Sequence, residues 1–119
     1  MNVTNRRLEF EYLYKEIILE AMRNILDKNG KLVLRVSGSS MYPALQDGAC
    51  VTVIKYSFEN LKIGDIIVYQ KFETHTTIHR IKSIIKDGDF KFLRTQGDNN
   101  QFLDEYIVSE VDFWGKAEV

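Results

Sequence analysis

Ser40 is the first residue of this 119-residue chain whose setting suggests chemistry. It ends a short polar stretch, Ser37-Gly-Ser-Ser40, that follows an apolar run and precedes Met41. Gly38 permits a tight turn, which can present a serine side chain at a surface and direct successive backbone N–H groups outward. Such N–H groups are what an oxyanion hole requires. Taken alone, however, the stretch favours an ordinary polar loop.

Histidine is scarce, with His75 and His79 the two examples. His79 lies in the alternating pattern Thr77-Ile-His-Arg-Ile81, which is typical of a strand with one face directed inward. A neutral imidazole can accept the proton of a serine hydroxyl at neutral pH. Two histidines four residues apart share a strand face, but no clear third ligand accompanies them, so we predict no metal and no cofactor.

Two aspartates follow in the segment Gln96-Gly-Asp-Asn-Asn-Gln-Phe-Leu-Asp104. A buried carboxylate bonded to the far ring nitrogen of His79 would hold the imidazole in the required tautomer. The alternatives are that Asp98 is a turn former, since aspartate often bonds its own backbone, and that Asp104 is a surface charge.

Composition narrows the class of protein. Sixteen basic and seventeen acidic residues give a net charge of −1, which lacks the basic footprint of a nucleic-acid binder. Cys50, the single cysteine, excludes an internal disulfide and is predicted to be a buried filler of a strand. No apolar run approaches the roughly 20 residues that span a bilayer. We therefore expect a cytoplasmic protein with no transmembrane segment, or alternatively one held at a membrane surface.

The elements that must position these residues are one helix and several strands. Apolar residues recur at three- and four-residue steps over about residues 5–28, and Asp27-Lys-Asn-Gly30 ends the pattern. Short β-branched runs then predict strands at 32–36, 50–55, 65–69, 77–85, 90–95 and 111–119. The sequence thus predicts a single, mainly β domain over residues 1–119, small and highly curved, with one N-terminal amphipathic helix.

The helix has two interpretations. Its predicted apolar face could cover the core of the β region, or it could dock on a partner or a membrane surface, which its aromatic residues favour slightly. That face comprises Phe10, Leu13, Tyr14, Ile17, Ala21, Met22 and Ile25.

In combination and order, these signals resemble the clan that unites signal peptidases with LexA-type self-cleaving proteins, over roughly residues 33–116. The stretch from Ser37 to Leu45 is similar to the nucleophile box of that clan, with Met41 and Pro43 at their expected places. Gly64 to Tyr69 resembles its next strand, and Thr77 to Lys82 the box that carries the general base.

The base and the acids favour one branch of the clan. Bacterial signal peptidases and LexA-type proteins use a lysine where this chain has His79 followed by Arg80. The branch of archaea, the endoplasmic reticulum and some Gram-positive bacteria uses histidine, with a Gly-Asp-Asn-Asn box and a second aspartate six residues on. Asp98 and Asp104 have that spacing.

The resemblance implies a serine endopeptidase that acts through an acyl-enzyme on a leader, signal or pro-segment bound as an extended strand. It implies Ser40 as nucleophile, His79 as base, Asp104 as the favoured orienting acid and Asp98 as a supporting or alternative acid. The backbone N–H groups of Ser39 and Ser40 would form the oxyanion hole.

Two other functions stay open. The first is a self-cleaving LexA-type regulator, against which the short segment before the nucleophile box argues. The second is a catalytically silent peptide-binding scaffold, against which the presence of nucleophile, base and both acids argues. The family box usually reads Gly-Asp where this chain has Gly48-Ala49, and Asp47 is the carboxylate that could substitute.

Overall fold

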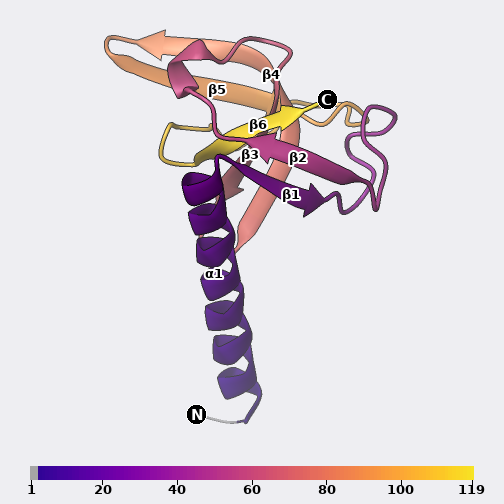
Figure 1. Cartoon of the computed structure of the whole chain (residues 1–119), viewed down its shortest axis with the longest axis vertical. Helices are drawn as coiled ribbons and strands as arrows, with labels where there is room; N and C mark the ends of the chain where they lie inside the picture. Colours follow the sequence, from indigo (N-terminus) through magenta and orange to yellow (C-terminus); the bar gives the residue numbers. More distant parts are fainter. Residues whose placement is uncertain (1–2) are drawn as a thin grey trace.

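The computed structural model describes the backbone of residues 3–119 and the side chains of residues 12–119. A long helix, α1 (Val3–Asn29), is followed by β-structure (Figure 1). The strands are β1 (Lys31–Arg35), β2 (Cys50–Ile54), β3 (Ile66–Lys71), β4 (His75–Asp87), β5 (Phe90–Gln96) and β6 (Phe113–Glu118), with a short 3-10 helix, η1 (Phe58–Asn60), between β2 and β3. The predicted mainly β fold with one helix is confirmed, and β4 extends two residues beyond the predicted range at each end.

The strands of the described chain form one antiparallel sheet in the order β1-β2-β6-β3-β4-β5. β6, the last strand, inserts between β2 and β3. This insertion brings the two halves of the β region into one layer. It also leaves β1 at one edge of the sheet and β5 at the other.

The burial of β3 shows how strongly the sheet curves. Residues Ile66–Tyr69 are all buried, so β3 is covered on both faces although it belongs to a single sheet. Ile67 and Tyr69 pack in a cluster with Phe58, Ile66 packs with Met41, and Val68 packs with Trp114. The sheet must therefore fold over itself, and register shifts in the β3–β6 and β4–β5 pairs provide local bends.

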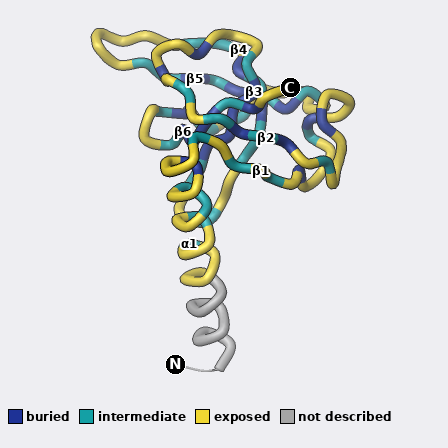
Figure 2. The backbone as a smooth tube through the Cα atoms, in the orientation of Figure 1, coloured by how far each residue is buried: buried dark blue, intermediate teal, exposed yellow. Residues whose placement is uncertain are grey.

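The C-terminal part of α1 packs on the sheet, whereas the rest of its described length projects away from it (Figures 1 and 2). Leu26 is buried against Val53 and Trp114, and Leu19 and Met22 pack around the same cluster at helical spacing. Arg23 adds a polar tether, since its guanidinium donates to the backbone carbonyl of Phe113 at 3.2 Å.

The packed face of α1 is not the face that the sequence pattern predicted. Met22 belongs to both the predicted face and the packed face, but most of the predicted face is exposed. Phe10 lies outside the residues whose side chains are described. The exposed members are Leu13, Tyr14, Ile17, Ala21 and Ile25. The prediction failed because α1 carries apolar residues on more than one side, and contact with the sheet selects the side of Leu19 and Leu26. Docking of the exposed side on a partner or membrane surface stays a prediction.

The prediction that Cys50 fills the core was wrong. Cys50 is exposed, because the alternation along β2 directs Val51 and Val53 into the core and Cys50 to the opposite face.

Candidate active site

The loop between β1 and β2 presents Ser40 next to a buried anchor. Met41 is buried in the core, and its carbonyl accepts a hydrogen bond of 2.8 Å from the N–H of Leu45, so the loop turns back on itself. Gly38 has a φ of +89°, a left-handed value that a side chain would strain. Its N–H donates to Asp47 Oδ1 at 2.8 Å. Asp47 thus holds the backbone just before the serine.

Ser40, His79 and Asp104 form one chain of hydrogen bonds. The oxygen of the Ser40 hydroxyl lies 3.0 Å from Nε2 of His79. Nδ1 of the same ring lies 2.6 Å from Oδ2 of Asp104. His79 is buried in β4, and Asp104 comes from the segment after β5. The fold thus brings His79 within hydrogen-bonding distance of Ser40, which lies 39 positions before it, and of Asp104, which lies 25 positions after it.

Two further hydroxyl groups meet the carboxylate of Asp104. The hydroxyl of Thr95 donates to Oδ2 at 2.7 Å, and that of Tyr69 lies 3.3 Å from the same oxygen. Tyr69 and Thr95 are both fully buried. Burial raises the pKa of Tyr69 to about 12. The backbone N–H of Asp104 donates to the carbonyl of Thr95 at 2.8 Å. This bond also holds the backbone from which the Asp104 side chain extends.

Asp98 is engaged by Arg80 rather than by His79. The guanidinium of Arg80 donates to both carboxylate oxygens of Asp98, at 2.9 and 2.8 Å, and to the carbonyl of Gly64 at 2.8 Å. The hydrogen bond from Arg80 lowers the pKa of Asp98 below its usual range, and Asp98 raises the pKa of Arg80. This ion pair ties the segment after β5 to β4, next to the histidine.

The turn that contains Asp98 also contacts the serine loop directly. The N–H of Asn99 donates to the carbonyl of Ser40 at 2.8 Å, and its side-chain amide donates to the carbonyl of Ser39 at 3.2 Å. Gly97 lies so close to the serine loop that a Cβ at this position would be 2.6 Å from the Ser40 carbonyl oxygen and 3.0 Å from His79 Nε2. No side chain fits at position 97 without moving the site.

The N–H groups of Ser39 and Ser40 donate to no acceptor within the part of the chain that the structure describes. Free N–H groups beside a serine hydroxyl can bind an oxygen that becomes negatively charged during a reaction. Together with a histidine acceptor, this arrangement has the parts that acyl transfer needs.

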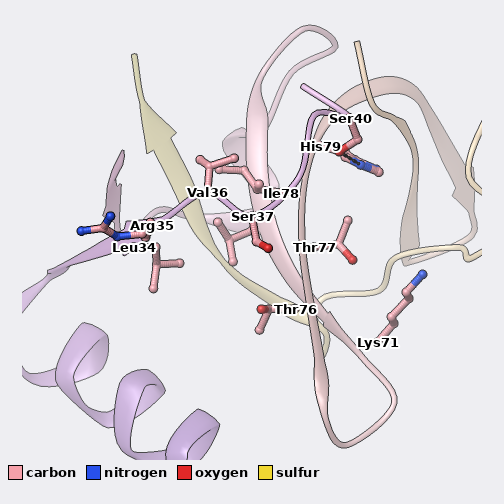
Figure 3. Close-up of a pocket in the computed structure, with 11 residues that line it drawn as sticks. Leu34, Arg35, Val36, Ser37, Ser40, Lys71, Thr76, Thr77, Ile78 and His79 are labelled. Carbon is pink, nitrogen blue, oxygen red and sulfur yellow. Dashed lines mark hydrogen bonds between the residues drawn. The ribbon is translucent and has the colours of Figure 1, made fainter. Parts of the chain in front are cut away.

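A hollow of about 290 Å³ opens beside the serine and histidine (Figure 3). Its walls come from the end of β1 and the following residues on one side, and from β3 and β4 on the other. Ser40 and His79 lie at one end, whereas Thr76 and Lys71 lie towards the other (Figure 3). Val36 and Ile78 contribute apolar surface. A chain segment placed in this hollow would therefore reach the Ser40 hydroxyl.

The residues singled out from the sequence have different surroundings. Ser40, His79 and Asp104 are in mutual contact, and Asp98, Arg80 and Met41 lie around them without joining the hydrogen-bonded chain. His75 lies four residues along β4, where its ring contacts Thr74. Sequence reasoning missed Tyr69, Thr95, Gly97 and Asn99 as parts of the site. The Gly-Asp-Asn-Asn motif could have indicated the last two, but no local signal marks the first two.

A Ser-His-Asp chain of hydrogen bonds on a strongly curved antiparallel sheet defines a serine-peptidase-like protein. The sequence matches the peptidase S24-like family over residues 7–118, and the chain belongs to that family. It is also 32% identical, over 82 residues, to signal peptidase I W of Bacillus subtilis (strain 168). That match covers 68% of this chain and 43% of the relative, so the chain spans less than half of the relative's length. No helix in the described residues is long and apolar enough to cross a membrane.

Proposed function

We propose that this protein is a serine endopeptidase of the histidine-containing branch, with Ser40 as nucleophile, His79 as general base and Asp104 as the acid that orients the base. The observation that carries the proposal is the unbroken contact from Ser40 Oγ through both ring nitrogens of His79 to Asp104 Oδ2, at 3.0 and 2.6 Å. Membership of a peptidase family supports it.

The reaction follows from the direction of these hydrogen bonds. Ser40 Oγ attacks a peptide carbonyl carbon while its proton moves to His79 Nε2. Asp104 stabilises the imidazolium, and the N–H groups of Ser39 and Ser40 bind the oxyanion. His79 then donates the proton to the leaving amine as the C–N bond breaks. Water, activated by the same histidine, hydrolyses the acyl-enzyme and restores the serine.

The backbone around the hollow can bind substrate as a strand. Residues 76–79 of β4 pair with β3 along one edge, whereas pairing with β5 begins at Arg80. β1 is the edge strand of the sheet and pairs with β2. Two unpaired backbone edges therefore border the hollow, and an extended peptide of about four residues could bond to both.

The dimensions of the hollow favour small side chains next to the cut. Its volume of about 290 Å³ must hold several residues of substrate, and Val36 and Ile78 narrow its sides. We infer that the substrate is the leader, signal or pro-segment of a peptide or protein, with small uncharged residues before the scissile bond.

The test combines a covalent probe with peptide cleavage. A fluorophosphonate is expected to label the protein at Ser40, located by peptide mass spectrometry, and quenched fluorogenic peptides with Ala, Ser or Gly before the cut are expected to be cleaved. Ser40→Ala should abolish both, and His79→Ala should reduce both. Ser57→Ala and His75→Ala are matched controls that should retain both. Unchanged cleavage by Ser40→Ala or His79→Ala would overturn the assignment.

The two alternatives give different results in the same experiments. A self-cleaving regulator would lose its intact mass on storage, and Ser40→Ala would prevent that loss. A silent scaffold would bind peptides in the hollow without reacting with the probe. We expect a constant intact mass together with probe labelling.

A further inference from the structure

Three donors meet one oxygen of Asp104, and two of them come from residues that have no part in the proposed reaction. Besides His79 Nδ1 at 2.6 Å, Oδ2 lies 2.7 Å from the Thr95 hydroxyl and 3.3 Å from the Tyr69 hydroxyl. The two hydroxyl groups also contact each other at 3.1 Å. Tyr69 and Thr95 have no exposed surface, so these hydrogen bonds are shielded from competing water.

Counting hydrogens gives these contacts a direction. A threonine hydroxyl has one hydrogen, and Thr95 donates it to Asp104, so its oxygen faces Tyr69 as an acceptor. The single hydroxyl hydrogen of Tyr69 must then point to Thr95 and Asp104. Tyr69 therefore donates to Thr95 and Asp104, and Thr95 donates to Asp104. Because burial raises the pKa of Tyr69 to about 12, its hydroxyl keeps this hydrogen at neutral pH.

The same count applies on the histidine side. A carboxylate oxygen has no hydrogen to give, so the contact of 2.6 Å requires the hydrogen on His79 Nδ1. In the neutral imidazole Nε2 then has no hydrogen, and it faces the Ser40 hydroxyl at 3.0 Å as an acceptor. The tautomer of the neutral imidazole thus depends on a carboxylate oxygen of Asp104 facing Nδ1, and here that oxygen is Oδ2.

Asp104 needs such support because it lies outside the strands. It follows β5 by eight residues, in an irregular segment. Its backbone is attached to β5 through its N–H bond to the Thr95 carbonyl and through the guanidinium of Arg94, which donates to its carbonyl at 3.0 Å. These contacts fix the main chain but leave the side-chain torsions free. Besides the contact with His79, the hydroxyl groups of Thr95 and Tyr69 restrain the carboxylate.

We propose that Thr95 and Tyr69 are positioning residues of this site, which hold the Asp104 carboxylate against His79 and thereby set the tautomer that activates Ser40. The inference rests on the proposed function, because it concerns the same three residues. It extends the site by two strands, since Thr95 lies on β5 and Tyr69 on β3.

The first test reads the hydrogen bond itself and needs no substrate. A short Nδ1–H···O bond gives a far-downfield proton resonance, which is assigned by its loss in His79→Gln. We expect it in the unmodified protein and in Thr95→Ser, which keeps the hydroxyl. We expect it to vanish or exchange rapidly in Thr95→Val, which keeps the shape but not the donor, and to weaken in Tyr69→Phe.

The second test separates catalysis from binding. Thr95→Val is expected to lower kcat about tenfold to a hundredfold, with KM within about twofold, because a displaced carboxylate misaligns the base without altering the hollow. Thr95→Ser should restore most of kcat. Thr52→Val, the same substitution on β2, should leave kcat and the resonance unchanged. Thermal unfolding of each variant checks that it is folded at the temperature of the kinetic assay, so that kcat is compared between folded proteins.

Two outcomes would overturn the inference. One is that the Thr95→Val variant and the Tyr69→Phe variant both keep the downfield resonance. The other is a Thr95→Ser protein as impaired as Thr95→Val, which would assign the effect to packing. If the unmodified protein cleaves no peptide and resists the fluorophosphonate, the proposed function fails, while the resonance still decides whether Thr95 and Tyr69 position Asp104.

Discussion

The side-chain amide of Asn99 donates a hydrogen bond of 3.2 Å to the carbonyl oxygen of Ser39. A peptide unit is planar, with its C=O and N–H directed to opposite sides. Holding the Ser39 carbonyl therefore also directs the N–H of Ser40, one of the two proposed oxyanion donors. The N–H of Asn99 holds the next carbonyl, that of Ser40, at 2.8 Å. One residue thus orients the serine turn from across the site.

Replacing Asn99 should impair catalysis more than substrate binding. Asn99→Asp puts a carboxylate oxygen where the amide donor faces the Ser39 carbonyl, so the turn loses this restraint and the two oxygens repel, whereas the backbone bond from residue 99 to the Ser40 carbonyl remains. Because loss of one oxyanion donor costs about 10²–10³ in kcat, we expect a fall of at least tenfold with little change in KM. Steady-state kinetics check this. Asn60→Asp, the same change in exposed η1, is the control, and equal kinetics for the two variants would contradict the role of Asn99.

The two aspartates should differ sharply on conversion to asparagine. In Asp104→Asn the amide can donate to His79 Nδ1, which favours the tautomer with its hydrogen on Nε2, facing Ser40. We expect kcat to fall by about 10³–10⁴. Asp98→Asn disturbs the pair with Arg80 but leaves the Ser40–His79–Asp104 contacts, so its loss should be at least about tenfold smaller. Similar losses, measured on folded protein, would count against Asp104 as the orienting acid.

Gly97 should tolerate no side chain. The Cβ of Gly97→Ala would lie 2.6 Å from the carbonyl oxygen of Ser40 and 3.0 Å from His79 Nε2, so either the turn or the imidazole must move. A displacement of that order costs about a hundredfold in kcat. Gly115→Ala is a matched control, because its Cβ would lie 2.5 Å from the Ile54 carbonyl oxygen, outside the catalytic residues. It should lower stability by about 1–3 kcal/mol while kcat per folded molecule persists.

The Arg80–Asp98 pair predicts a dependence of stability on pH at the acid end. The pKa of Asp98 is lowered in the folded protein, so the contribution of the pair is present above the unfolded pKa, about 4, and is lost as pH falls through the folded value. We expect the melting temperature to fall more steeply below about pH 4 in the unmodified protein than in Asp98→Asn. Thermal unfolding at a series of pH values checks this, and parallel curves would contradict it.

The sequence predicted the elements better than the contacts between them. β-Branched runs located each strand, and the family motifs named Ser40, His79 and Asp104. Those motifs are local, so they carry no information on which strands become neighbours. Thr95 and Tyr69 reach Asp104 because β3 and β5 flank β4, a consequence of strand order. The packed side of α1 and the outward face of Cys50 likewise depend on tertiary contacts, which outweigh a periodicity read along one segment.

Tyr69 offers a last prediction, at the alkaline end of the pH range. Burial raises its pKa from 10 to about 12, so an unfolded chain ionises this tyrosine at a pH where the folded chain still keeps its proton. Its contribution to stability is therefore full below pH 10 and is lost as pH rises through about 12. The Tyr69→Phe variant lacks the hydrogen bonds of this hydroxyl at every pH, and it also lacks the group whose ionisation destabilises the folded protein at alkaline pH. The difference in unfolding free energy between the two proteins should be constant from about pH 7 to 9 and should shrink above about pH 10. Urea unfolding at each pH measures this difference, and a gap that stays constant at alkaline pH would mean that the Tyr69 hydroxyl is not shielded as its contacts with Thr95 and Asp104 require.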